Sequence, residues 1–140
     1  MSLTSDREGL RGYVTARGFG PYVIPVPVQS LALRDYCARK KLLYVLPANE
    51  NCFPHSYLVL EGMVADLSGY EGIVMCSMFM LPQRAERRRC LCQRVFDQGC
   101  AIHLVIEDMI VTGPQGVDSL EELLVIDRLA AQAPSSIALD

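Results

Sequence analysis

The sequence has 140 residues, of which 51% are hydrophobic and 21% are charged, and its formal net charge is −3. This length is typical of one domain, and the high apolar content excludes an intrinsically disordered chain. The acidic charge balance argues against a nucleic-acid partner. The apolar content also predicts a homo-oligomer, because a small monomer can hide little apolar surface. We therefore predict a single α/β domain over residues 1–140, with flexible ends at 1–10 and 134–140.

The six cysteines are not accompanied by a secretory signal, which predicts reduced thiols and a cytoplasmic protein. Cys90 and Cys92 form a C-x-C pair, but no second pair or nearby histidine completes a zinc set. No metal and no other cofactor is therefore predicted. No apolar run is long enough to cross a bilayer, so we expect no membrane partner.

The first third of the chain predicts a strand, a structured loop and a helix. The run 11–15 is rich in strand formers. Glycines and prolines over 18–27 predict a loop rather than a helix. The helix is expected over 29–41, just after Pro25 and Pro27, where the missing N–H groups cost least.

A second strand and a second helix follow. The apolar run 42–46 predicts the strand, with Pro47 closing it. A polar loop over 48–55 then leads to a helix expected at 56–67, for which Ser56 is the candidate N-cap.

The clearest strand prediction is 72–80, whose first residues are apolar without alternation. This pattern is typical of a strand buried on both faces of a parallel sheet. Pro82 ends the strand, and the next helix is expected over 84–98, with Gly99 as its C-terminal stop.

The last predicted elements are a strand at 101–106 and a helix at 119–131. Ser119 and Glu122 match a capping box at the start of that helix. Strands and helices thus alternate along the whole chain. This order predicts a three-layer α/β sandwich with a mostly parallel sheet of about four strands, resolvase-like or flavodoxin-like.

In such sheets a site forms at the carboxyl ends of the strands. At those positions Glu50 and His55 are the candidate catalytic pair, since an imidazole beside a carboxylate can transfer protons near neutral pH. Eight further residues are candidates for ligand binding: Arg17, Tyr22, Asn49, Asn51, Ser56, Tyr57, Ser77 and Glu107.

Several candidates also have a structural interpretation. Arg17 is either an anion clamp or a surface ion-pair partner. The asparagines and Ser56 also suit turns and caps, and Glu107 suits a loop cap. His103 lies among apolar residues and is expected in the core. The basic cluster at 84–89 is either a solvated helix face or a contact for phosphate or an acidic partner.

Part of the pattern resembles the catalytic domain of serine recombinases, the resolvase and invertase family. The resemblance comprises a strand near Tyr13, a helix beginning at Gln29-Ser30-Leu31, and the run 99–104 leading to Glu107. That family uses a serine nucleophile flanked by arginine at the exit of the first strand, where this chain has Thr15-Ala16-Arg17. The resemblance therefore implies the fold, and recombinase activity is not expected.

Longer motifs resemble the bacterial sporadic carbohydrate cluster protein family. They are RGYVT at 11–15, IPVPVQSL at 24–31, RDYC at 34–37, NENCFPHSY at 49–57 and SMFMLP at 77–82. The family is named for gene clusters that make surface polysaccharides or unusual sugars. The resemblance implies this setting but assigns no residue a role.

Together these observations predict a protein that binds or converts a sugar, sugar phosphate or sugar nucleotide. A lyase or isomerase step suits the candidate residues better than phosphoryl transfer, because no phosphate loop or metal-binding carboxylate pair is visible. The alternative is a non-catalytic binding or assembly module with a degenerate resolvase-like fold.

Overall fold

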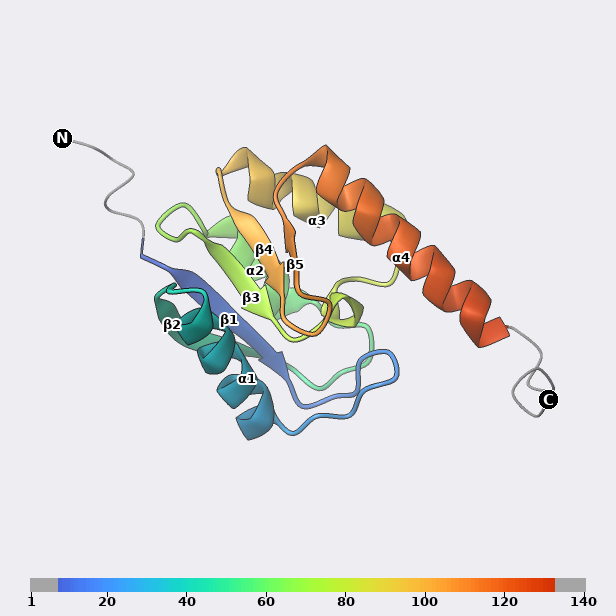
Figure 1. Ribbon diagram of the computed structural model, residues 1–140, viewed down its shortest axis with the longest axis horizontal. Helices are drawn as coiled ribbons and strands as arrows, with labels where there is room; N and C mark the ends of the chain where they lie inside the picture. The colour runs from blue at the N-terminus through green and yellow to red at the C-terminus, as the bar shows by residue number, and fades with distance from the viewer. Residues whose placement is uncertain (1–7, 133–140) are drawn as a thin grey trace.

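The computed structural model describes residues 8–132, in which one five-stranded sheet is flanked by helices (Figure 1). The strands are β1 (Leu10–Thr15), β2 (Tyr44–Glu50), β3 (Gly72–Met75), β4 (Ala101–Leu104) and β5 (Met109–Val111). The helices are α1 (Val26–Arg39), α2 (Leu58–Ala65), α3 (Ala85–Asp97) and α4 (Pro114–Gln132), with a short 3₁₀ turn, η2 (Met78–Met80), after β3.

The strand order is β2-β1-β3-β4-β5. The first four strands run parallel, with Leu10 opposite Tyr44 in β1 and β2, and Gly72 opposite Ala101 in β3 and β4. The predicted α/β class with a mostly parallel sheet is confirmed. The structure adds β5, which pairs antiparallel with β4 after a tight reversal at Asp108, where φ is 51°.

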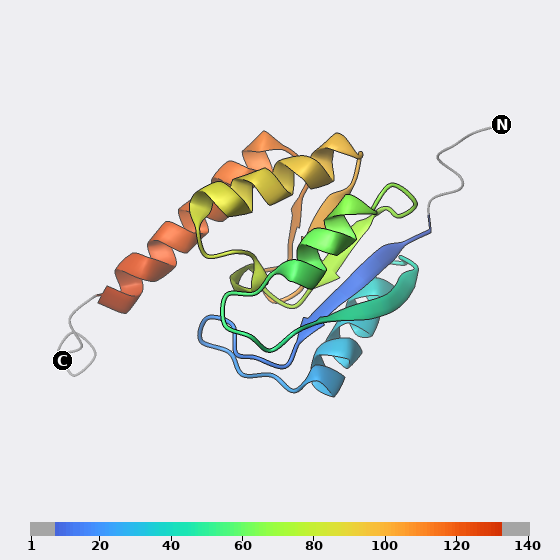
Figure 2. The same ribbon diagram turned by 180° about the vertical axis from the view of Figure 1, so that it is seen from behind.

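The helices form layers on both faces of the sheet. Helix α1 covers one face in Figure 1, and α2 and α3 cover the other, as the view from behind shows (Figure 2). Helix α4 packs beside α3 and β5 and then extends past the body of the domain (Figure 1). The central strand β3 is completely buried, as its unbroken apolar run predicts.

His103 lies in the core, as its sequence position predicts. It is 8% exposed, and its Nδ1 lies 2.8 Å from the Tyr36 hydroxyl oxygen. Burial lowers the pKa of His103. The contact joins α1 to β4 across the face of the sheet.

Strand β2 is longer than its sequence predicts. It continues through Pro47 to Glu50, although Pro47 was expected to close it. The physical reason is its position at the edge of the sheet, where a residue without an N–H can face away from the ladder. The asparagine-rich loop therefore begins later than expected, and Asn49 belongs to the strand.

The helix starts also differ from their predictions. Helix α1 begins at Val26, with Pro27 inside its first turn. Ser56 is not a helix cap, because Tyr57 occupies the N-cap position of α2 and makes no side-chain cap bond. Ser119 lies inside α4, which begins at Pro114, so the predicted capping box is wrong.

The predicted strand 72–80 divides in two. Its ladder ends at Met75, and 78–80 form η2, whose N-cap Ser77 accepts a hydrogen bond from the Phe79 N–H through its hydroxyl. The apolar residues there are still buried, so an apolar run alone did not separate the strand from the turn.

Residues 1–7 and 133–140, for most of which we predict flexible ends, lie outside the described residues. Residues 8–10 belong to the packed part. The Glu8 and Gly9 N–H groups donate to Gly69 O and to the Glu71 carboxylate, and Leu10 begins β1.

Candidate functional site

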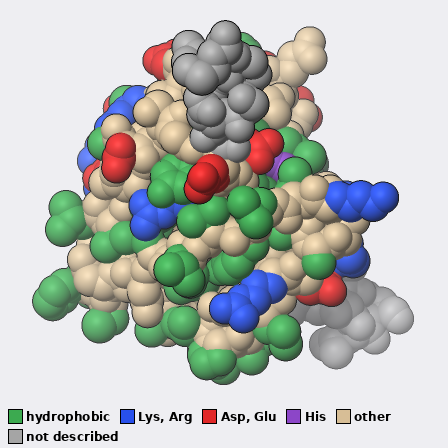
Figure 3. Space-filling view, turned by 90° about the vertical axis from the view of Figure 1, so that its left-hand side faces the viewer, with side chains coloured by type: hydrophobic (Ala, Val, Ile, Leu, Met, Phe, Trp, Pro, Cys, Tyr) green, Lys and Arg blue, Asp and Glu red, His purple; other side chains and the backbone are tan. Residues whose placement is uncertain are grey.

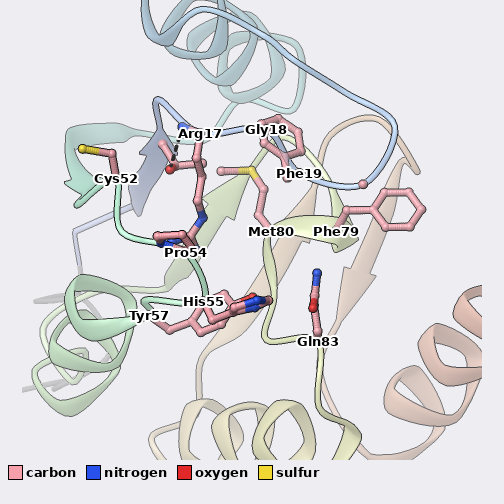
Figure 4. A pocket seen from close by; sticks show the side chains of 12 residues that line it. Arg17, Gly18, Phe19, Cys52, Pro54, His55, Tyr57, Phe79, Met80 and Gln83 are labelled. Carbon is pink, nitrogen blue, oxygen red and sulfur yellow. Dashed lines mark hydrogen bonds between the residues drawn. The ribbon is translucent and has the colours of Figure 1, made fainter.

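A cavity of about 250 Å³ opens at the carboxyl ends of β1, β2 and β3, the edge that the sequence predicts for a site. Three loops build it, and none of the twelve lining residues is acidic. Figure 4 shows the loop after β1, the loop between β2 and α2, and the segment after β3 contributing side chains around one space. The lining residues are Thr15, Arg17, Gly18, Phe19, Gly20, Cys52, Pro54, His55, Tyr57, Phe79, Met80 and Gln83. We refer to it as the Arg17 cavity.

Arg17 reaches from the exit of β1 across to the β2–α2 loop (Figure 4). Its Nη1 donates to Phe53 O at 2.8 Å, and its Cζ lies 5.0 Å from the centre of the Tyr57 ring. Within residues 8–132 its side chain makes this single hydrogen bond and no ion pair. Since a guanidinium carries five N–H donors, most of its donors are open to a ligand.

The loop after β1 is held in place by a buried amide. Gln29 is fully buried, and its Nε2 donates to Thr15 O at 2.6 Å and to Ile24 O at 2.7 Å, while its Oε1 accepts from the Thr15 N–H at 3.1 Å. Phe19 and Tyr22 close a tight turn through two backbone hydrogen bonds of 3.0 Å. The backbone that carries Arg17 therefore has a defined position.

Glu50, one of the two candidate catalytic residues, is 3% exposed and accepts four hydrogen bonds. The donors are the Tyr13 hydroxyl at 2.9 Å and the backbone N–H groups of Asn51, Val59 and Leu60 at 3.1 Å each. Two of these N–H groups belong to the first turn of α2, so Glu50 caps this helix from the neighbouring strand. Burial, and secondarily Glu50, raises the pKa of Tyr13, which keeps its hydroxyl a donor. This geometry gives Glu50 a structural role.

His55, the other candidate catalytic residue, lines the Arg17 cavity from an exposed turn. Its backbone has a positive φ of 58°, which is uncommon for a residue with a side chain. Glu50 lies outside the lining of the cavity and uses both of its carboxylate oxygens elsewhere. The structure thus places His55, and not the predicted pair, at the cavity.

Ser77 and Glu107 form a pair beneath η2. The Ser77 hydroxyl donates to Glu107 Oε2 at 2.8 Å, and Glu107 Oε1 accepts from the Met78 N–H at 3.0 Å. Ser77 is completely buried. Neither side chain lines the Arg17 cavity, and both serve to fix the segment that carries Phe79.

The remaining candidates flank the cavity. Tyr22 packs near Phe79, with ring centres 6.1 Å apart, and so supports its wall. The Asn51 side chain accepts a hydrogen bond from the Phe53 N–H at 3.2 Å, which is a turn contact. Asn49 and Ser56 do not line the cavity. Of the ten candidates, Arg17, His55 and Tyr57 are brought together there.

The cavity also contains Phe19, Phe79 and Gln83, which are not among the ten candidates. Gln83 stands just before α3. Nothing in the sequence singles it out, since an isolated glutamine between Pro82 and a predicted helix is typical of a loop.

The basic cluster at 84–89 divides between two environments. Arg88 is 5% exposed and forms a two-bond ion pair with Glu121 of α4, with both N–O distances at 2.6 Å. It also donates to Pro82 O and Gln83 O. Arg87 instead forms two 2.9 Å bonds with Glu61, and its Cζ lies 5.0 Å from the Tyr57 ring centre. The cluster therefore does more than form a solvated face.

The six cysteines are all free, and four of them are buried: Cys37, Cys76, Cys92 and Cys100. Burial raises the pKa of both Cys76 and Cys92 to about 11, so these thiols stay protonated and unreactive. Residues 8–132 contain no group of three or more His, Cys, Asp or Glu side chains placed to hold a metal ion. No helix in this part of the chain is both long enough and apolar enough to span a membrane.

No family model and no curated protein matches this sequence. Its similarity to the sporadic carbohydrate cluster family therefore stays a prediction. Solved structures do match. A resolvase family site-specific recombinase from Streptococcus pneumoniae superimposes with a TM-score of 0.63 and 12% identity, covering 88% of this chain and 91% of that one. The N-terminal catalytic domain of TP901-1 integrase gives 0.55 and 12%, covering 87% and 97%.

One neighbour is a resolvase family recombinase, the family that the predicted elements resemble, and the other is the catalytic domain of an integrase. At 12% identity the likeness concerns the fold alone. Thr15 at the exit of β1 is 1% exposed, and its hydroxyl accepts from the Arg17 N–H at 3.3 Å. The chain has a resolvase-like fold.

Proposed function

We propose that this chain binds a small anionic sugar derivative in the Arg17 cavity, within bacterial surface-polysaccharide or unusual-sugar biosynthesis. The observation that carries the proposal is the Arg17 guanidinium, which lies over Tyr57 with most of its donors unused beside a cavity without acidic lining. Guanidinium groups bind carboxylates and phosphates through paired N–H donors. The biosynthetic setting rests on the motif resemblance.

The other lining groups suit a sugar ring. Phe79 offers apolar ring surface, while His55 and Gln83 offer hydrogen-bonding groups. A volume of about 250 Å³ lies just below the range of about 300–1,000 Å³ usual for drug-sized ligands. The Arg17 cavity by itself therefore has room for one sugar ring, and the rest of a sugar nucleotide would extend beyond it.

The test is a thermal-shift and calorimetric titration with glucuronate, glucose 1-phosphate, UDP-glucose and glucose. We expect the anionic compounds to raise the melting temperature, and Arg17→Gln to weaken their binding at least tenfold. Arg11→Gln is the matched control, because Arg11 lies over Tyr70 at the opposite end of the same strand, 5.7 Å from the ring centre. Equal binding by the Arg17→Gln protein would refute the proposal.

Conversion of the bound sugar, by a lyase or isomerase step, would require proton transfer. His55 is the lining side chain suited to this, since Glu50 is engaged at α2. Incorporation of solvent deuterium into the sugar, followed by proton NMR, reports such transfer. We expect His55→Gln to abolish exchange while leaving binding within about threefold, and exchange that survives in this variant would remove His55 from the role.

A second candidate function is self-association as an assembly module, which the surface of α4 favours. Leu120 is the single buried residue of this 19-residue helix, whereas Val125, Ile126 and Leu129 are 48%, 60% and 61% exposed. At about 100° per residue these three lie on the far side of α4 from Leu120. Other apolar side chains gather on the lower part of the face seen in Figure 3, between isolated charged groups.

Light scattering after gel filtration tests this second candidate. We expect an oligomer for the wild-type chain and a monomer for Ile126→Lys/Leu129→Lys. A wild-type monomer at high concentration would exclude it. The two candidates are compatible, because α4's outer side lies apart from the Arg17 cavity.

A further inference from the structure

A second cavity adjoins the Arg17 cavity on the side of α3. It has a volume of about 240 Å³ and is lined by His55, Tyr57, Pro82, Gln83, Arg84 and Arg87. His55, Tyr57 and Gln83 line both cavities. The two are therefore compartments of one cleft, and we refer to this one as the Arg87 cavity.

Tyr57 stands between two guanidinium groups. The Cζ atoms of Arg17 and Arg87 each lie 5.0 Å from the centre of its ring. The ring is 6% exposed, so it is held within the domain while the two cations approach from β1's exit and from α3. Attraction between cations and an aromatic ring stabilises this placement.

The charge in the Arg87 cavity is positive. Neither cavity has an Asp or Glu among its lining residues. Within the described part of the chain, Glu61 on α2 pairs with Arg87 through Nε and Nη2, so the Nη1 donors of Arg87 stay open to a ligand and the unpaired charge of this cavity is that of Arg84. Arg84 has no ion pair or side-chain hydrogen bond with any other residue of 8–132. The whole chain has a net charge of −3, whereas this cleft carries the unpaired cations Arg17 and Arg84. The local positive charge favours an anionic ligand.

The two compartments differ in chemistry. The Arg17 cavity contains aromatic and neutral polar side chains beside one guanidinium, which suits a sugar ring. The Arg87 cavity contains two guanidinium groups and the shared imidazole. Two arginines around one pocket suit the three oxygens of a phosphate better than the two of a carboxylate.

We propose that the ligand is a phosphorylated sugar, with its ring in the Arg17 cavity and its phosphate in the Arg87 cavity, between Arg84 and Arg87. This inference rests on the proposed sugar-binding function and narrows its substrate class from any anionic sugar to a phosphate ester. A sugar acid would then occupy the Arg17 cavity alone. A sugar nucleotide would extend its nucleoside beyond the Arg87 cavity.

The decisive comparison is calorimetric titration of glucose 1-phosphate, UDP-glucose and glucuronate into the full chain. We expect the phosphorylated compounds to bind at least tenfold more tightly than glucuronate. Arg84→Gln should weaken their binding at least fivefold and leave glucuronate binding unchanged. Arg89→Gln is the matched control, because Arg89 is in α3, just after Arg84, has a 62% exposed side chain and lines neither cavity.

Arg87 requires a paired design, because its removal alone leaves Glu61 without a partner. Glu61→Gln keeps Arg87 and removes the competing carboxylate, so we expect phosphate-ester binding as tight as in wild type or tighter. Arg87→Gln/Glu61→Gln removes the guanidinium while leaving two amides that can still bond each other, and it should weaken the same binding at least fivefold.

The outcomes separate the two proposals. If Arg84→Gln and Arg87→Gln/Glu61→Gln bind glucose 1-phosphate as the wild type does, the phosphate does not lie in the Arg87 cavity, and this inference is wrong. Arg17-dependent binding of glucuronate would then still support the proposed function. If the wild-type chain binds none of the compounds, both proposals are wrong.

Discussion

Replacing Glu50 by Gln tests whether this carboxylate is a structural cap or a catalytic group. Oε1 accepts from the Tyr13 hydroxyl and the Leu60 N–H, and Oε2 accepts from the Asn51 and Val59 N–H groups. Gln keeps nearly the same shape but has one acceptor oxygen and one NH₂ group. The variant therefore changes hydrogen bonding and charge without leaving a cavity.

The loss of stability depends on which of two orientations the new amide adopts, and the orientation that loses fewer hydrogen bonds sets its size. With the NH₂ group at the Oε2 position, both the Asn51 and Val59 N–H groups lose their acceptor. With the NH₂ group at the Oε1 position, the Tyr13 hydroxyl can accept instead of donate, so one backbone bond, to Leu60, is lost. A bond to a charged acceptor contributes about 1.5–3 kcal/mol. Loss of the negative charge at the start of α2 adds about 0.3–2 kcal/mol.

We therefore expect Glu50→Gln to lower the free energy of unfolding by about 2–4 kcal/mol. For a domain of this size, that corresponds to a fall of about 6–15 °C in melting temperature. Urea unfolding followed by circular dichroism measures the change. Tyr13→Phe is the companion variant, since it removes one of the four bonds and keeps the carboxylate.

A double-mutant cycle of these two substitutions measures how much stronger the Tyr13 hydroxyl bonds the carboxylate than the amide, for which we expect a coupling of about 1 kcal/mol. A Glu50→Gln protein with stability within about 0.5 kcal/mol of wild type would refute the capping role. In that case Glu50 would return as a partner for His55 in proton transfer.

Three further predictions concern the frame of the site. Arg88→Met should lower the free energy of unfolding in urea by about 3–5 kcal/mol, because Glu121 would stay partly buried without its partner. Arg88→Met/Glu121→Leu should recover most of this stability. If it recovers none, the loss is not due to the unpaired Glu121 carboxylate. Burial lowers the pKa of His103 in the folded chain, so the unfolded state binds the proton first, and the free energy of unfolding should decrease as pH falls below about 6.5. The urea midpoints at pH 5 and pH 8 should therefore differ less for His103→Gln than for the wild type. An equal difference would assign the pH dependence to other groups. Gly20→Ala should lower the melting temperature by several degrees, because φ there is 56° and a Cβ would collide with the Phe79 ring; an unchanged melting temperature would contradict the close packing of this turn.

The order of elements was predictable because it depends on local patterns. The unbroken apolar run at 73–75 and the nearly apolar run at 101–104 predict buried parallel strands, and the structure places β3 and β4 there. Helix α3 begins and ends within one residue of its prediction over 84–98. The edge of the sheet that carries the cavity was also predictable, since it follows from the parallel order of the strands.

Boundaries that depend on neighbours were not predictable in the same way. Pro47 was expected to end a strand, but an edge strand tolerates it. The three-residue strand β5 is too short for a periodic signal and forms because β4 offers a free edge. Ser56 and Ser119 have the residue types of helix caps, yet neither occupies a cap position.

The sequence by itself determined the α/β class, the buried His103 and the strand-end loops that contain Arg17, His55 and Tyr57. Only the tertiary structure decided which polar groups are free to meet a ligand. Glu50 accepts a hydrogen bond from Tyr13, 37 residues away, and Ser77 donates one to Glu107, 30 residues away. Arg17 and Arg87 meet at Tyr57 from opposite parts of the chain. The physical reason is that hydrogen bonds and ion pairs form between side chains brought together by packing, and such pairings leave no periodic trace in the sequence.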